Sequence, residues 1–419
     1  MRSQRTPGSE PPAYAGGRLA IAQTILMIKK HFIKFAAKPN LVFTLCVLCA
    51  LGGYSQAQDF KQLHPGVEYA QVRKEISGLN VNINLLRLDL TQVRLDVRHA
   101  MDAAIGMEKT SSIAKRHGAV AAINAGFFRL DSSLWAGEAA GTLVIDHRTL
   151  SESLNNRIAI FIDNFDPNVT NVNFAHLDLY TLAKIGSEEF RVSGINRERK
   201  ADELIEYTSE FGRTTLTDPN GVEIIVEKGK VVRVVVGGSS PIPPNGYVLS
   251  ASGKLADRIR SIRIGFKVRA NAATPFTVGS NGFPNKDTDR TTQAFSRAED
   301  ITNGIPQLIR DGKIEITWEQ EKTSKSFVET RHPRTAVAKL KDGKFLMITV
   351  DGRSESSGGI SLQDLADYLL SLGAVDAMNL DGGGSTTMYL DGKVVNTPSD
   401  KEGERRIGDA ILVTLRKKQ

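Results

Sequence analysis

The stretch FLMITVDGRSESSGGISLQDLADYLLSLGAVDAMNLDGGG, residues 345–384, decides the fold that the sequence predicts. Its first six residues are apolar and predict a buried strand that ends at Asp351. Ser361 and Asp364 then form an N-terminal capping pattern ahead of apolar residues that share one helical face, and a glycine follows as the stop. VDAMNL predicts a second strand that ends at Asp381. The whole segment therefore predicts a β-α-β crossover.

The expected crossover places two acidic residues at one edge of a sheet. Such a connection is nearly always right-handed and joins parallel strands, so Asp351 and Asp381 should emerge at the same carboxyl edge, where ligands bind in α/β sheets. Adjacent strands lie about 4.8 Å apart, so both carboxylates could reach one ligand. The loops DGRSESSGG and DGGGSTT add backbone amides, hydroxyls and Arg353, whose guanidinium suits a phosphate. We favour a ligand site here over two ordinary turns.

The rest of the chain predicts a protein rich in strands. Residues 81–97 alternate apolar and polar side chains, which indicates two half-buried strands. We expect an α+β fold with a β-rich core of mixed sheets, helices packed on it, and the C-terminal crossover. Residues 58–110 should supply N-terminal strands of the catalytic unit and residues 111–419 the catalytic domain, with 188–330 as a lobe over the site.

The first 57 residues predict an export signal. LVFTLCVLCAL, residues 41–51, is an apolar run that follows several lysines and precedes small residues suited to cleavage after Ala57. The run is short for a bilayer span, so we favour a secreted or periplasmic protein over one with a stable membrane anchor. Translation from Met27 is an alternative start.

Removing this segment leaves a nearly neutral protein. Residues 58–419 contain 47 Lys or Arg and 46 Asp or Glu, so the basic charge of the full chain belongs mostly to the export signal. A nucleic-acid partner is therefore not expected. Cys46 and Cys49 also lie in the removed segment, which excludes disulfides, a thiol nucleophile and cysteine-bound metal in the remainder. The sequence gives no indication of the oligomeric state.

Other polar residues stand at strand ends and have two interpretations of similar weight. His332 and Arg334 precede an apolar strand, where they are either solvated or placed to bind an anion. Asn124 and Gly126 could aim an amide at a sugar hydroxyl or form a turn, and Glu138 is a candidate acid. Three motifs are missing: a Walker loop, a G-x-S-x-G elbow and a histidine pair at metal-ligand spacing. We expect no cofactor and no metal.

Several stretches together resemble the phosphodiester glycosidase family. They are INAGFF, IPQLIRDGKI, RHPRTAVA, VDGRSESSGG, NLDGGGSTTMY and ERRIGDA, in order from about residue 120 to 410. The resemblance implies hydrolysis of a sugar-1-phosphodiester at the glycosidic bond, which releases the sugar and leaves a phosphomonoester. Ala125 and Arg406 depart from the family pattern, where a glycine and a proline are expected. Carried over by position, the family site comprises Asn124, His332, Arg334, Asp351, Arg353, Asn379, Asp381, Gly382, Gly383, Ser385 and Arg405.

The expected chemistry rests on the leaving group. A phosphate monoester, whose last proton has a pKa of about 6, leaves with little acid help, so the site needs cations to hold the phosphate charge. Asp351 or Asp381 would activate water or stabilise an oxocarbenium-like sugar. Two alternatives stay open: a metal-dependent phosphodiesterase acting on cell-surface glycans, and a glycan-binding protein without turnover. In each case the partner is a sugar phosphodiester or a phosphate-containing glycan.

Overall fold

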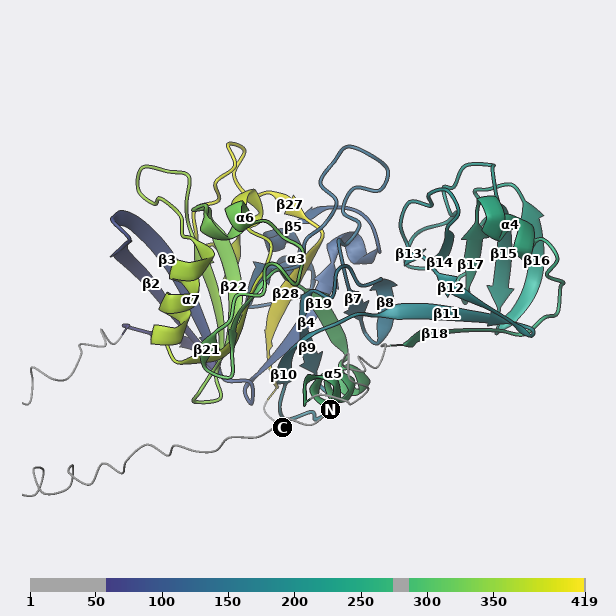
Figure 1. Ribbon diagram of the computed structural model, residues 1–419. Coiled ribbons are helices and arrows are strands. Elements are labelled where there is room, and N and C mark those ends of the chain that lie inside the picture. Colours follow the sequence, from purple (N-terminus) through teal and green to yellow (C-terminus); the bar gives the residue numbers. More distant parts are fainter. Residues whose placement is uncertain (1–57, 274–285, 418–419) are drawn as a thin grey trace, which may run out of the picture. The chain divides into compact units, whose positions relative to one another are not determined.

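The computed structural model describes residues 58–273 and 286–417 (Figure 1). The expected export signal, its cleavage site and the alternative start at Met27 lie outside the described residues. Strands arranged in several sheets dominate the described part, and helices are few. The β-rich character of the predicted fold class is therefore confirmed. No helix within the described residues is long and apolar enough to cross a membrane.

The largest sheet contains the two strands of residues 345–384, β23 and β24. It has eight strands in the order β1-β2-β3-β23-β22-β24-β20-β21. Long apolar stretches form its central strands, which are buried throughout or nearly so. The bounds are β1 Lys61–His64, β2 Val67–Ile76, β3 Leu79–Leu88, β20 Gln307–Arg310, β21 Lys313–Ile314, β22 Arg334–Leu340, β23 Phe345–Val350 and β24 Ala374–Asn379.

Strands β23 and β24 are not neighbours in this sheet. The sequence-based expectation that both carboxylates follow adjacent strands was therefore wrong. Strand β22 lies between them and pairs antiparallel with both: Lys339 faces Phe345 on one side and Asp376 on the other. The ends of β23 and β24 are therefore about 10 Å apart, twice the spacing of adjacent strands. Asp351 and Asp381 follow these two ends, with the start of β22 between them.

Two further five-stranded sheets pack against one face of the large sheet. Val337 and Met347 of the large sheet share an apolar core with Ile123 and Ile411 of one smaller sheet and Ile160 of the other. The first runs β26 Lys393–Val394, β25 Met388–Leu390, β6 Ala121–Asn124, β28 Asp409–Leu415 and β4 Val93–His99. The second runs β10 Asn171–His176, β9 Ile158–Asp163, β19 Asp300–Asn303, β7 Leu143–Ile145 and β8 Arg148–Ser151.

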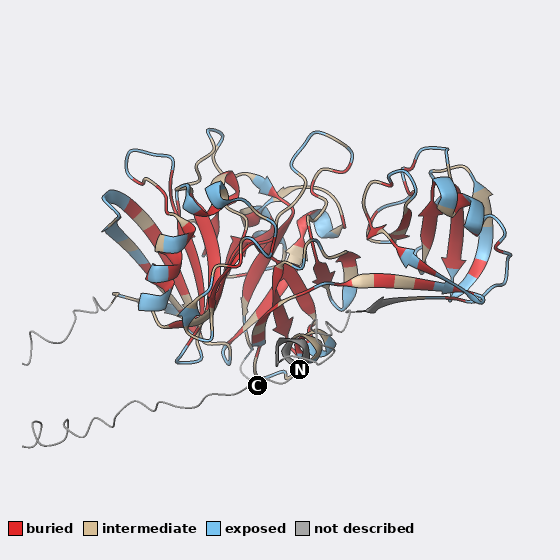
Figure 2. Ribbon diagram, in the orientation of Figure 1, coloured by how far each residue is buried: buried red, intermediate tan, exposed pale blue. Residues whose placement is uncertain are grey.

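Helix α7 (Leu362–Ser371) covers the opposite face of the large sheet, where the capping pattern predicted a helix. The Ser361 hydroxyl accepts a hydrogen bond from the Asp364 amide at 3.1 Å, as the pattern requires. Leu362, Leu365 and Leu369 pack on Ala336 and Ile348 of the sheet, while the outer face of the helix is exposed (Figure 2). The other helices are α3 Thr110–Arg116, α4 Gly253–Ile259, α5 Lys286–Arg297 and α6 Lys325–Glu329.

Residues 180–273 form two more sheets with their own apolar core. One has the order β12 Glu188–Val192, β11 Tyr180–Ile185 and β18 Val268–Ala273. The other has the order β13 Gly194–Ile195, β14 Leu204–Thr208, β17 Gly246–Ala251, β15 Val222–Glu227 and β16 Lys230–Val236. Residues 300–314, which the sequence analysis included in the lobe, instead supply β19, β20 and β21 to the larger sheets. A short pair, β5 Glu108–Lys109 and β27 Arg406–Ile407, completes the described strands.

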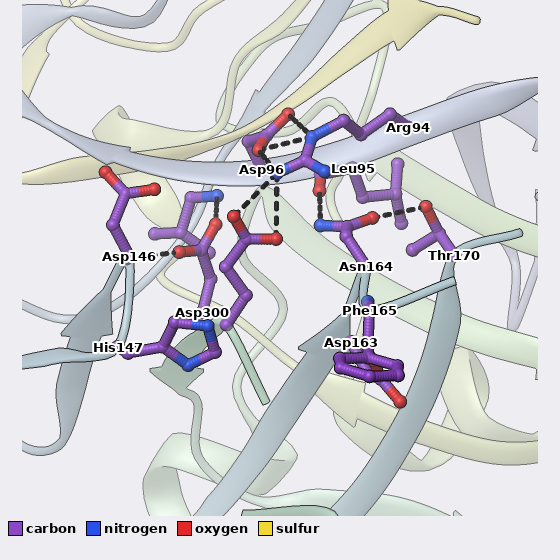
Figure 3. Close-up of polar contacts among 12 residues, drawn as sticks. Arg94, Leu95, Asp96, Asp146, His147, Asp163, Asn164, Phe165, Thr170 and Asp300 are labelled. Atoms are coloured by element: carbon purple, nitrogen blue, oxygen red, sulfur yellow. Dashed lines mark hydrogen bonds and ion pairs between the residues drawn. The ribbon is translucent and has the colours of Figure 1, made fainter. Parts of the chain in front are cut away.

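A buried carboxyl group on β19 ties this strand to β4 and to the turn between β7 and β8 (Figure 3). Asp300 at the start of β19 is fully buried and accepts hydrogen bonds from the amides of Val97 (2.7 Å) and Asp146 (2.9 Å). Nearby, Arg94 pairs with Asp96 and Glu299. Burial raises the pKa of Asp300 to about 7, although the two amides and Arg98 act in the opposite direction.

This raised pKa predicts a pH-dependent contribution to stability. The folded chain holds the Asp300 proton up to a pH of about 7, whereas the unfolded chain releases it near its ordinary value of 3.8. The contribution is therefore fully present below pH 4 and is lost as the pH rises through 7. Between these limits one such group changes the free energy of unfolding by about 1.4 kcal/mol per pH unit. Urea unfolding of the parent and Asp300→Asn between pH 5 and 7 should give converging stabilities; parallel curves would contradict the assignment.

Candidate active site

The loop NLDGGGSTT lies where β24 meets the first smaller sheet. The amide of Leu380 donates to Thr335 of β22 at 2.8 Å, and the amide of Asp381 donates to Ala125, just after β6, at 2.9 Å. Asp381 also accepts a hydrogen bond from the amide of Gly382 at 2.9 Å. The chain then makes a short 3-10 turn over Gly383–Ser385. The carboxylate is thus held at the junction of two packed sheets.

The three glycines allow arginine side chains and backbone to approach the loop closely. Gly383 has a φ of +62°, and a Cβ atom there would lie 3.1 Å from Nη2 of Arg353. A Cβ atom at Gly384 would overlap the side chains of Arg405 and Asp400. At Gly382 it would lie 2.8 Å from the carbonyl oxygen of Pro333. The loop is therefore flanked by two guanidinium groups at a distance that only glycine permits.

Asp381 has an electrostatic environment suited to proton transfer near neutral pH. The residue is only partly exposed. This burial raises its pKa to about 6, against the lowering effect of Ser385, the Gly382 amide and Arg405. The negative charge of Asp409 raises the pKa further. A carboxyl group with this pKa is mostly ionised at pH 7 and can still accept a proton readily.

Asp409 is a second carboxylate in the site that the sequence analysis missed. It begins β28, is buried, and accepts hydrogen bonds from the amide of Gly126 (2.9 Å) and the hydroxyl of Thr302 (2.7 Å). Burial raises its pKa, which Thr302 and His99 lower. A Cβ atom at Gly126 would lie 2.8 Å from the Thr302 oxygen, which explains the glycine. The motif ERRIGDA contained the only signal, a GD pair immediately before the C-terminal strand.

The side-chain amide of Asn124 forms hydrogen bonds with other residues of the protein. Its Oδ1 accepts hydrogen bonds from the Thr335 hydroxyl (2.8 Å) and the Thr387 amide (3.0 Å), and its Nδ2 donates to the carbonyl oxygen of Asp381 (2.6 Å). Asn124 therefore connects β6, β22 and both ends of the glycine loop. One of the two interpretations of the sequence aimed this amide at a sugar; in the structure it holds the backbone at Asp381.

Arg353, His332 and Arg405 surround the glycine loop from three other segments. Arg353 is exposed, has a φ of +60°, and lies with Nη2 3.4 Å from Nδ1 of His332. Burial, then Arg334 and Arg353, lower the pKa of His332, so its imidazole is neutral at pH 7 and can accept from Arg353. Arg405 makes two hydrogen bonds to Asp400, at 2.6 and 2.9 Å. No carboxylate within the described residues forms an ion pair with Arg353.

Two of the predicted site residues point into the protein. Arg334 is 2% exposed, donates to the carbonyl oxygens of Phe327 (2.6 Å) and Thr330 (2.9 Å), and lies over the Phe327 ring. Burial lowers its pKa to about 10. Asn379 is fully buried and donates to the carbonyl oxygen of Ile305 at 2.7 Å. These side chains support the segments that carry the site, and Arg334 acts on His332 through its charge.

Asp351 is held by a different loop from the one that carries Asp381. It is buried, and its Oδ1 accepts hydrogen bonds from the Thr397 amide (3.0 Å) and the Asn396 side chain (3.4 Å). Burial raises its pKa, against these hydrogen bonds. Asp351 lies on a cavity of about 470 Å³ that Arg73 and Lys74 also line. The structure thus places Asp351 beside a cavity where cations could meet an anionic group.

Glu138 lies away from these groups. It lines a cavity of about 500 Å³ with Arg129 and Arg197, and its carboxylate forms an ion pair with Arg129 at 3.7 Å. Burial raises its pKa and Arg129 lowers it. No contact among the described residues links Glu138 to Asp381, so Glu138 does not belong with Asp381 and Asp409.

Unused hydrogen-bonding groups gather on the glycine loop. Within the described residues, the hydroxyls of Ser385, Thr386 and Thr387 and the Oδ1 atom of Asn379 are buried and have no hydrogen-bond partner. Ser385 nevertheless lies near enough to lower the pKa of Asp381. Buried polar groups normally have partners, so this loop retains capacity for polar contacts. The described part of the chain holds no group of three or more His, Cys, Asp or Glu side chains arranged for a metal ion.

Part of this chain is similar to a known protein family. Residues 220–414 match the phosphodiester glycosidase family. The resemblance expected from the sequence is thereby confirmed, and the matched phosphodiester glycosidase domain contains every predicted site residue from His332 to Arg405. Asn124, Gly126 and Glu138 precede the match.

Related proteins share short segments with this chain. The N-acetylglucosamine-1-phosphodiester alpha-N-acetylglucosaminidase of Bos taurus is 38% identical over 109 residues, which are 24% of this chain and 20% of that protein. The SPbeta prophage-derived uncharacterized protein YomE of Bacillus subtilis is 36% identical over 107 residues, which are 26% of this chain and 16% of that protein. The chain thus spans a fifth or less of the length of these two relatives.

Solved structures share the fold over most of the chain. A hypothetical protein from Synechocystis superposes with a TM-score of 0.71 at 24% identity, covering 86% of this chain and 64% of its own. A protein of Burkholderia pseudomallei K96243 that is described as exported superposes with a TM-score of 0.67 at 22% identity, covering 81% and 75%. The phosphodiester glycosidase domain therefore lies within a fold that these structures also show.

Proposed function

We propose that this chain is an exported glycosidase that hydrolyses a sugar-1-phosphodiester at the glycosidic bond, releasing the sugar and leaving a phosphomonoester. The observation that carries the proposal is the position of Asp381. Its carboxyl group, with a pKa raised to about 6, stands at a glycine loop flanked by Arg353 and Arg405. The family match of residues 220–414 and the activity in the name of the bovine relative support the same reaction.

The leaving group explains why cations matter more than a strong acid. A departing phosphate monoester has a last pKa of about 6 and needs little protonation. The charge that grows on its oxygens is stabilised by guanidinium groups and by backbone amides that glycines leave accessible. Arg353 supplies a guanidinium that contacts His332 but forms no ion pair within the described residues, and Arg405 supplies one whose position Asp400 fixes. Both lie beside the glycine loop.

Asp381 is proposed as the base that activates the attacking water. The negative charge of Asp409 disfavours ionisation of Asp381 and so helps to keep the pKa of Asp381 high. Asp351 follows a strand about 10 Å away in the sheet and is engaged by Thr397 and Asn396. We therefore assign Asp351 to binding at the neighbouring cavity and not to a shared proton transfer with Asp381.

Arg353→Ala should lower kcat/KM for a sugar-1-phosphodiester by about 10- to 100-fold, because a hydrogen bond to a charged group contributes about 1.5–3 kcal/mol. The side chain is exposed, so thermal unfolding should be unchanged. Arg406→Ala is the matched control, since Arg406 is also exposed and lies one residue beyond Arg405. Equal kcat/KM for the two variants would remove Arg353 from the site.

A panel of α-linked sugar-1-phosphodiesters tests the proposed function directly. Assays should detect release of free sugar with an equal amount of phosphomonoester, and preincubation with EDTA should leave the rate unchanged. Release of sugar phosphate instead, or loss of activity in EDTA that a divalent cation restores, would favour the metal-dependent phosphodiesterase. Binding of the panel without turnover would favour a glycan-binding protein.

A further inference from the structure

Charge is distributed unevenly along the chain. Residues 227–270 contain nine Lys or Arg and two Asp or Glu, whereas residues 58–226 and 271–419 together contain 38 basic and 44 acidic residues. All nine cations of the short segment are exposed, and Figure 2 shows exposed residues on β16 and α4. A net charge of +7 in one segment of a nearly neutral protein creates a strong positive electrostatic potential there.

Backbone pairing gathers part of this charge at one place, which we name the basic tip. Lys230 pairs with Lys267 across an isolated bridge, the Val231 amide donates to Phe266 at 2.9 Å, and the Gly265 amide donates to Val231 at 2.8 Å. These contacts join the β15–β16 turn to the segment before β18. The basic tip consists of Lys228, Lys230, Arg263, Ile264, Phe266 and Lys267.

The basic tip also exposes large apolar side chains among its cations. Ile264 is 69% exposed and Phe266 is 41% exposed. Within the described residues, none of the four cations forms an ion pair, while Glu227 faces Lys230 across the hairpin and Glu188 pairs with Arg258 at 3.6 Å. Contact with water is unfavourable for large apolar side chains. Their exposure among unpaired cations therefore indicates a surface that binds a partner.

We propose that the basic tip binds the surface of a bilayer that contains anionic lipids. The cations are attracted to the negative surface potential of the bilayer, while Ile264 and Phe266 enter the headgroup region. A soluble polyanion would use the cations but would leave Ile264 in water, so the apolar pair favours the lipid surface. The binding is peripheral and does not depend on the glycosidase assignment.

Vesicle sedimentation tests the basic tip. Residues 58–419, which form one compact unit, should be mixed with vesicles of phosphatidylcholine alone or with about 30% phosphatidylglycerol added. We expect binding only to the anionic vesicles, weakened by added salt. Arg263→Glu with Lys267→Glu should reduce the binding constant by at least about tenfold, and Ile264→Ser with Phe266→Ser should do so without changing the charge.

The control pair Lys313→Glu with Lys393→Glu makes the same charge change at two exposed lysines outside the basic tip and should bind like the parent. Thermal unfolding and hydrolysis of a small sugar phosphodiester should be the same in all variants, which separates lipid binding from catalysis. Equal binding of the tip and control variants would overturn the proposal. Binding of soluble polyphosphate with no binding of anionic vesicles would also overturn it and would assign the surface to a polyanion.

Discussion

Asp381→Asn is expected to lower kcat for a sugar-1-phosphodiester by about 10²–10⁴-fold, the range over which a positioned general base acts. The amide can accept the hydrogen bond from Gly382 but cannot take a proton from water. Folding should be unaffected or slightly improved at pH 7, because the ionised carboxylate disfavours the folded state when burial raises its pKa. Steady-state kinetics and thermal unfolding measure the two effects.

The matched control is Asp367→Asn, which changes an exposed carboxylate on α7 and should leave kcat unchanged. In the parent enzyme kcat/KM should rise as the pH increases through about 6, because Asp381 acts as a base only when it is ionised. Asp409→Asn should move this midpoint to lower pH, since Asp409 raises the pKa of Asp381. An Asp381→Asn variant as fast as the parent would remove Asp381 from the chemistry.

Asn124→Ala is expected to destabilise the protein by about 2–4 kcal/mol and to abolish measurable turnover. The substitution leaves the buried Thr387 amide and the Asp381 carbonyl oxygen without the partners that Asn124 supplies, and each such loss costs about 1–3 kcal/mol. Because these groups lie at both ends of the glycine loop, the position of the Asp381 carboxylate should also change. Urea unfolding and the sugar-release assay measure the two effects.

Asn171→Ala is the control for this variant, because Asn171 is an exposed asparagine on β10 and its loss should change neither quantity. Normal stability of Asn124→Ala together with a raised KM would contradict the structural role. That result would return Asn124 to direct contact with substrate, as the sequence first suggested.

Local patterns predicted the local structure well. The Ser361 capping pattern and the apolar face of residues 362–370 predicted α7, because both act within one or two helical turns. Alternation over residues 81–97 likewise predicted β3 and β4, although it could not show that they join different sheets. Each of these features depends on neighbours in the chain.

Contacts between distant segments could not be predicted in the same way. Nothing in residues 345–381 indicates that β22 separates β23 from β24, because strand pairing across a sheet depends on the whole set of strands. Asp409 was missed because its partners Gly126 and Thr302 lie 283 and 107 residues away. Arg334 was expected to face a phosphate, but its place at the start of β22 turns it toward the carbonyl oxygens of Phe327 and Thr330.

Hydrolysis in ¹⁸O-labelled water tests the central claim most directly, because it identifies the bond that is cleaved. A glycosidase breaks the bond between the sugar carbon and the phosphate oxygen, so mass spectrometry should find the label in the released sugar and none in the phosphomonoester. Labelled sugar should form about 10²–10⁴-fold more slowly with Asp381→Asn. Label in the phosphate product would show cleavage at phosphorus and would contradict the account.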